Sequence, residues 1–185
     1  MKAMAQACYA ARRCGQRTST KEKKAMRILL ATDGSEYSEA AVDEIARRQF
    51  PVDSEVRIIS VFEPLSVLAG SYDGSVDMRI YDGMEQAAHE RARAAVEKAT
   101  AKLLADKDDR ILNVTMGVLS GSPKRVILEE AERFGADLIV VSSHGHGMLE
   151  RFLLGSVSQA VAFHAKCSVE IVRSPKTSTS ESKKQ

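Results

Sequence analysis

Tryptophan is absent from the sequence, and only 5% of the 185 residues are aromatic. We therefore do not expect a nucleic-acid site that stacks bases on aromatic rings. Three cysteines, Cys8, Cys14 and Cys167, are too few for a disulfide scaffold. No apolar run approaches the roughly 20 residues of a membrane-spanning helix, so we predict no membrane segment. The remaining composition, 44% hydrophobic and 28% charged, is typical of a globular chain with room for one domain and tails.

The net charge of +2 is distributed unevenly along the chain. Residues 1–25 carry seven basic side chains and one acidic one, and residues 174–185 carry three and one. The body, residues 26–173, has 17 basic and 23 acidic side chains and is therefore acidic. Both tails are polar and without hydrophobic periodicity, so we predict that they are disordered and that the body is the folded domain. An acidic body argues against broad nucleic-acid binding.

The basic N-terminal tail has two possible interpretations. It contains serine and threonine and almost no acid, as organelle transit peptides do, but it has no apolar stretch typical of a secretory signal. The simpler interpretation is an extension without function ahead of Met26.

Because the sequence shows neither a secretory signal nor a membrane segment, we predict a cytoplasmic protein.

The body alternates apolar strands with amphipathic helices. Continuous apolar runs indicate strands that are buried on both faces, as in parallel sheets. The expected strands are 27–33, 56–62, 111–118, 138–141 and 168–172, and the expected helices are about 35–50, 83–105, 123–134 and 155–164. Strands separated by helices need right-handed crossovers, so we predict an α/β fold with a parallel sheet and helices on both faces.

The strongest functional signal is the loop after the fourth strand, residues 141–158. Ligands of such sheets bind beyond the carboxyl ends of the strands, where this loop and Asp33 both lie. Glycines allow close approach of the backbone, and the helix that follows presents its positive N-terminus. The backbone of Gly155 and the hydroxyls of Ser156 and Ser158 add donors for phosphate oxygens. The alternative is that the glycines only permit tight turns.

Two common nucleotide motifs are excluded at this loop. A Gly-Lys-Ser/Thr sequence is absent, so it is not a Walker A loop, and Glu150 stands where a dinucleotide fingerprint needs its third glycine. The glycines of this loop have a spacing that neither motif has: Gly145 is followed by nine residues and then by Gly155-Ser156. Together with the opening segment 29–35 and the ending 155–173, it resembles the nucleotide-binding motif of the universal stress protein family. The resemblance covers Met26 to Arg173, with Ser142 in place of the motif's first glycine.

The resemblance implies a fold, a ligand and an assembly. The implied fold is a Rossmann-like sheet of order 3-2-1-4-5, similar to the adenine nucleotide alpha hydrolases. The implied ligand is ATP, with Mg²⁺ or Mn²⁺ bridging its phosphates. The implied assembly is a homodimer through the edge strand Ser168–Val172, whose apolar side chains favour pairing. The nucleotide-binding residues implied are Ala31, Thr32, Asp33, Val61, Val141, Ser142, His144, Gly145, Gly155, Ser156, Val157 and Ser158. Asp33 has an alternative role as a cap of the helix that begins near Ser35.

A binding protein is favoured over a dedicated enzyme. An acyl-transfer site would need Ser143, His144 and Asp33, but adjacent Ser and His side chains do not easily face each other, and no nucleophile elbow is present. Slow ATP hydrolysis or autophosphorylation fits better, with Lys124 and Arg151 as charge stabilisers. His144 and His146 are the histidines nearest the site, but their spacing is a poor metal signature, and we assign no metal-ligating residue. The leading hypothesis is a nucleotide-dependent switch or sensor of stress. The alternative is a dimeric interaction module without ATP, and no protein partner is indicated.

Overall fold

The computed structural model describes residues 24–64, 78–105, 113–145 and 154–174. The predictions about the two tails, most of the connection 63–81, and His146 and Arg151 lie outside the described residues.

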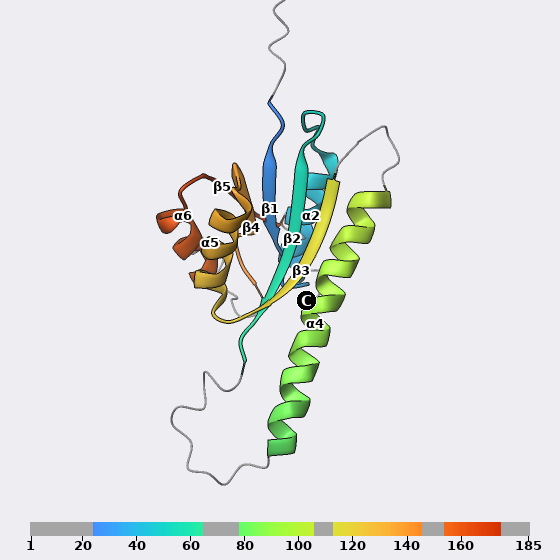
Figure 1. Cartoon of the computed structure of the whole chain (residues 1–185), viewed down its shortest axis with the longest axis vertical. Helices are drawn as coiled ribbons and strands as arrows, with labels where there is room; N and C mark the ends of the chain where they lie inside the picture. Colours follow the sequence, from blue (N-terminus) through green and yellow to red (C-terminus); the bar gives the residue numbers. More distant parts are fainter. Residues whose placement is uncertain (1–23, 65–77, 106–112, 146–153, 175–185) are drawn as a thin grey trace, which may run out of the picture.

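Five parallel strands form one sheet with the order β3-β2-β1-β4-β5. Helices cover both faces of the sheet, with α2 and α4 on one side and α5 and α6 on the other (Figure 1). The predicted fold class and strand order are confirmed. The elements are β1 (Arg27–Ala31), α2 (Glu36–Arg47), β2 (Glu55–Phe62), α4 (Met78–Ala105), β3 (Asn113–Ser120), α5 (Pro123–Phe134), β4 (Leu138–Ser142), α6 (Ser156–His164) and β5 (Ser168–Val172).

Strand β1 shows why its sequence is apolar without interruption. Ile28 and Leu30 belong to the core under α2 and α4, whereas Leu29 belongs to the core under α5 and α6. All three side chains are fully buried. Successive residues of a strand face opposite sides of the sheet, so a strand covered on both sides needs apolar residues at every position.

The ends of α5 agree with the sequence prediction. Pro123 occupies the start of the helix after Ser122, and Gly135 ends it in the left-handed conformation at φ 68°. Proline lacks the amide that a first helical turn leaves unpaired, and glycine enters the left-handed region without steric cost. These two residues fix where α5 begins, and its first turn borders the cavity described below.

Helix α2 ends at Arg47, three residues before the expected end at Phe50. Arg48 is already extended, at φ −85° and ψ 137°. Its guanidinium donates to both carboxylate oxygens of Glu170 on β5, at 2.6 and 2.8 Å. A local sequence pattern does not predict this contact, because Arg48 and Glu170 are 122 positions apart in the chain.

Two other boundaries differ from the prediction. Strand β3 runs over Asn113–Ser120, two residues later than expected, because it pairs along the whole of β2 from Glu55 to Phe62. Helix α4 begins at Met78, five residues early, and its first half projects past the carboxyl edge of the sheet (Figure 1). Within the described part of the chain, no helix combines the length and the apolar character needed to cross a bilayer.

Candidate functional site

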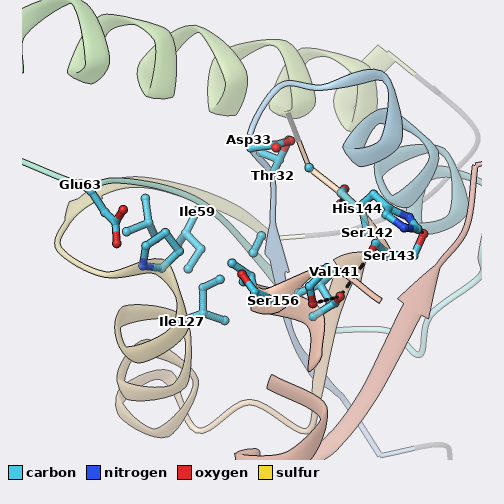
Figure 2. Close-up of a pocket in the computed structure, with 17 residues that line it drawn as sticks. Thr32, Asp33, Ile59, Glu63, Ile127, Val141, Ser142, Ser143, His144 and Ser156 are labelled. Atoms are coloured by element: carbon cyan, nitrogen blue, oxygen red, sulfur yellow. Dashed lines mark hydrogen bonds between the residues drawn. The ribbon is translucent and has the colours of Figure 1, made fainter. Parts of the chain in front are cut away.

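A cavity of about 480 Å³ lies at the carboxyl ends of the strands. Its volume is in the range of small-molecule sites. Residues from β1, β2, β4 and the segments that follow them meet there with the first turns of α5 and α6 (Figure 2). All twelve residues implied by the sequence resemblance line it. Five further residues line it as well: Ile59, Glu63, Pro123, Ile127 and Ser143.

Asp33 organises the turn between β1 and α2. Its Oδ1 accepts from the Ser35 amide at 3.0 Å and from the Ser35 hydroxyl at 2.6 Å. Ser35 is the N-cap of α2, and its Oγ accepts from the Ser38 amide at 3.2 Å. The alternative role expected for Asp33 is therefore corrected in detail, because the aspartate holds the capping serine and is not itself the cap.

Ser142 occupies the position where the family motif has its first glycine. Its hydroxyl donates to the carbonyl of His144 at 2.7 Å. Among the described residues other than glycine, only Asp53 has a positive φ. The backbone at residue 142 is thus open to any L-residue, and serine there introduces no strain.

The backbone of Ser143 joins three elements. Its amide donates to the carbonyl of Val172 on β5 at 2.8 Å. Its carbonyl accepts from the amide of Gly155 at 2.8 Å and from the hydroxyl of Ser158 at 3.2 Å. Ser158 is only 2% exposed. The Gly155 amide and the Ser158 hydroxyl, expected as donors to phosphate, are therefore engaged within the protein.

The remaining donors of α6 are differently placed. Gly155 gives the helix no side-chain cap, so the amides of the first turn after it are the groups that a helix start leaves without intrahelical partners. Ser156 is exposed and lines the cavity. An anion at this end of the cavity would meet these amides, the Ser156 hydroxyl and the positive end of the helix dipole.

Two glycines of the site are required for space. A Cβ atom on Gly145 would lie 2.6 Å from Oδ2 of Asp33. A Cβ atom on Gly155 would lie 3.2 Å from the carbonyl oxygen of Ser143, although φ at Gly155 is an ordinary −61°. The glycines thus bring the loops after β1 and β4 and the start of α6 close together.

The His144 imidazole faces α2. Its ring centroid is 5.7 Å from that of Tyr37, and its Nδ1 is 3.0 Å from the hydroxyl of Ser143. The Nε2 atom is buried and has no partner among the described residues. Adjacent Ser and His side chains do face each other here, so the sequence argument against this pair was wrong.

The contact between Ser143 and His144 does not by itself make a catalytic triad. Ser143 is 2% exposed, and the Asp33 carboxylate is committed to Ser35. A triad needs an accessible nucleophile and a third group that orients the base.

The cavity has two chemically different ends (Figure 2). Ile59, Ile127 and Glu63 lie together at one end, and Asp33, Ser142 and His144 lie toward the other. The apolar end was missed in the sequence. The signal that could have found it is position, because Glu63 directly follows β2 and Ile127 lies in the first turns of the helix after β3, at the same edge of the sheet.

Comparison with known proteins gives a consistent result. The family model described as "Universal stress protein family" matches residues 24–173. A universal stress protein of Methanocaldococcus jannaschii is 32% identical over 150 residues, which is 81% of this chain and 83% of that protein.

Two solved structures share the fold and hold adenine nucleotides. A universal stress protein in complex with cAMP has a TM-score of 0.53 and 24% identity, over 81% of this chain and 98% of that one. A family protein of Arabidopsis thaliana with AMP bound has a TM-score of 0.53 and 18% identity, over 85% and 97%. From the family match and the curated relative, this chain belongs to the universal stress protein family.

Proposed function

We propose that this protein binds ATP in the cavity and acts as a nucleotide-dependent switch or sensor in the stress response. The observation that carries the proposal is the cavity itself, which joins an apolar end of isoleucines to the uncapped N-terminus of α6. A nucleotide has the same polarity, with an apolar base at one end and an anionic phosphate chain at the other. The cAMP and AMP bound to two proteins of the same fold support an adenine base.

A divalent cation, Mg²⁺ or Mn²⁺, fits this cavity together with the phosphates. The lining includes two carboxylates, Asp33 and Glu63, whose negative charges oppose that of a phosphate chain. A cation held mainly by phosphate oxygens lowers this repulsion, and Mg²⁺ commonly binds in that way with few protein ligands. The Ser156 hydroxyl is the described group best placed to contact the phosphates.

Ser142 is the position that separates this proposal from the alternative, an interaction module that no longer binds ATP, because it departs from the family motif. The residue introduces no backbone strain and its hydroxyl is used by the loop carbonyl of His144. The departure from the family motif is therefore compatible with a formed site. Catalysis beyond slow hydrolysis or autophosphorylation is not part of the proposal, because Ser143 is buried and is therefore not an accessible nucleophile.

A homodimer through β5 is the assembly we propose. Among the described strands, β5 pairs with β4 alone and stands at the edge of the sheet. Ile171 and Val172 are half-buried, and Phe163 on the neighbouring α6 is 76% exposed. Apolar groups beside an unpaired strand edge favour association with a second edge.

The decisive experiment measures nucleotide directly. Purified protein is denatured and its released small molecules are chromatographed, and a second sample is titrated with ATP and Mg²⁺ and again with EDTA. We expect ATP to be bound at millimolar concentration or below, with weaker binding in EDTA. Absence of both co-purified nucleotide and millimolar binding would exclude the proposal and leave the interaction module.

A charge at Ser156 tests the location of the phosphates. Ser156→Asp places a negative charge in the first turn of α6, where the dipole stabilises it, so the melting temperature should not fall. The same charge repels phosphate, and we expect ATP affinity to fall by roughly tenfold or more. Ser156→Ala is the matched control and should cost only a few-fold. Equal ATP affinity in Ser156→Asp and the wild type would place the phosphates elsewhere.

Gly155→Val tests whether a bulky side chain at the start of α6 blocks ATP. Its Cβ would press on the Ser143 carbonyl, so ATP binding should be lost and the melting temperature should fall as well. Gly83→Ala is the control, because a Cβ there meets no atom within 4 Å. Unchanged ATP affinity in Gly155→Val would contradict the assignment of the site.

A further inference from the structure

Among the described residues that line the cavity, Glu63 is the charged side chain on the side of its isoleucines. It follows directly after β2 and lines the cavity together with Ile59 and Ile127, toward the same side of Figure 2. No described residue forms a hydrogen bond or ion pair with it. The other cavity carboxylate, Asp33, is engaged by Ser35, so Glu63 is the carboxylate left to meet a ligand.

The chemistry of the two ends orients a ligand. Phosphates belong at the start of α6, where Ser156 and the helix dipole lie. The base then extends toward the side chains of Ile59 and Ile127, which offer apolar contact to a flat ring. Ile59 is fully buried and Ile127 is 3% exposed, so both are held firmly by the core. Glu63 lines the cavity beyond these side chains, on the side away from Ser142 and His144, so its carboxylate is the described charged group available to the edge of such a ring.

An ionised carboxylate can only accept hydrogen bonds. Where the carboxylate meets position 6 of the ring, it accepts from the amine of a 6-aminopurine and is repelled by the oxygen of a 6-oxopurine, whose N1–H donor lies on the neighbouring ring atom. We propose that Glu63 is a specificity-determining residue that selects 6-aminopurine nucleotides over 6-oxopurine nucleotides in this cavity. The inference rests on the proposed nucleotide function and adds to it a residue that reads the base.

The expected size of the selection is modest. Glu63 remains exposed to solvent, so water competes for its oxygens. A hydrogen bond to a charged group gives at most one to two orders of magnitude in affinity, and exposure reduces this to about tenfold. An effect of that size is measured readily by equilibrium titration.

The test compares three triphosphates on the full chain in Mg²⁺. The nucleotides are ATP, inosine triphosphate with a 6-oxo group, and purine riboside triphosphate, which has hydrogen at position 6. For the wild type we expect ATP to bind about tenfold more tightly than the purine riboside nucleotide, with inosine triphosphate weakest. In Glu63→Ala the ATP and purine riboside affinities should agree within about twofold.

Glu63→Gln should shift the nucleotide preference in the opposite direction, toward inosine triphosphate. A glutamine amide can donate as well as accept, so its NH2 group should donate to the 6-oxo oxygen and raise the relative affinity of inosine triphosphate. Glu129→Ala on α5 is the control for the loss of one negative charge, because Glu129 is exposed and pairs with Arg125 away from the cavity lining. It should leave all three affinity ratios at wild-type values.

The outcomes separate the two proposals. If the wild type binds none of the three nucleotides, the proposed function fails and this inference fails with it. If it binds them and the ATP-to-purine riboside ratio is the same in Glu63→Ala, the inference alone is overturned. Tighter binding of inosine triphosphate than ATP by the wild type overturns it as well. A ratio that falls in Glu63→Ala and shifts toward the 6-oxo nucleotide in Glu63→Gln supports it.

Discussion

At the scale of single residues, the site is determined by where a side chain has room. Gly145 and Gly155 leave no space for a Cβ without displacing Asp33 or the Ser143 carbonyl. Ser142 is different, because its backbone conformation is open to any residue and its hydroxyl has a partner of its own. The loop after β4 therefore tolerates serine at one motif position and demands glycine at two others.

The first prediction concerns Ser142→Gly, which restores the family motif. We expect ATP affinity to change by no more than about twofold, because no strain is relieved. The free energy of unfolding should fall by about 1 kcal/mol, because glycine is more flexible and the bond to the His144 carbonyl is lost. Titration and urea unfolding check the two parts. A large gain in affinity would show that serine obstructs the ligand.

At the scale of elements, α5 is tied to the sheet by a buried carboxylate. Glu130 is 5% exposed and pairs with Arg57 on β2 and with Arg133 on its own helix. The same helix brings Pro123 and Ile127 to the cavity. The ion pair thus holds in place the helix that supplies one apolar wall of the site.

Truncation of Glu130 leaves Arg57 without its carboxylate, and the Arg57 side chain is only 19% exposed. We expect Glu130→Ala to lower the free energy of unfolding by about 3 kcal/mol. Glu129→Ala removes an exposed ion pair with Arg125 on the same helix and should cost less than about 0.5 kcal/mol. Urea unfolding of both variants measures the difference. Equal losses would mean that burial of Glu130 has no energetic consequence.

Helix α2 carries a pH-dependent contact at its end. Hydrogen bonds from Arg48 and then Arg47 lower the pKa of Glu44 below its ordinary 4.5. Because the folded pKa lies below the unfolded one, ionised Glu44 stabilises the fold at neutral pH, and this contribution is lost as the pH falls through the folded pKa. Glu44→Gln should therefore be less stable than the wild type at pH 7, and the gap should close toward pH 3. Urea unfolding across this pH range checks it, and a gap of constant size would contradict the assignment.

The boundaries of the helices and strands show which of them local sequence patterns predict correctly. Both ends of α5 and the whole of β5 are where the sequence placed them, because Pro123, Gly135 and short apolar runs act locally. The end of α2 and the bounds of β3 are not, because Arg48 is drawn to Glu170 and β3 takes its register from β2. Contacts between distant segments accompany these shifts of two to three residues.

At the scale of the whole molecule, the free edge at β5 and the cavity share a connection. The Ser143 amide bonds the end of β5, and the Ser143 carbonyl bonds Gly155 at the start of α6. The surface proposed for dimerisation and the proposed phosphate site are therefore two hydrogen bonds apart.

The prediction at this scale is a dimer in solution. Light scattering at micromolar concentration should give twice the mass of 20.2 kDa. Phe163→Ser removes a large exposed apolar side chain of α6, a helix that contacts β5, and should weaken association if α6 lies within the interface. Tyr37→Ser, at a side chain that is 37% exposed on α2, is the control. A monomeric mass for the wild type would refute the proposed assembly.

The sequence by itself determined the alternation of strands and helices, the burial of the sheet on both faces and the edge at which a ligand would bind, because each of these follows from periodicity, capping residues and chain order. The resemblance of three segments to a known family also identified twelve of the residues that line the cavity. Only the tertiary structure shows which polar groups of these residues are hydrogen-bonded within the protein. The Gly155 amide and the Ser158 hydroxyl are engaged by the Ser143 carbonyl, and Glu63 lines the same cavity as Ile59 and Ile127. Those outcomes depend on distances between segments far apart in the chain, which no local pattern contains.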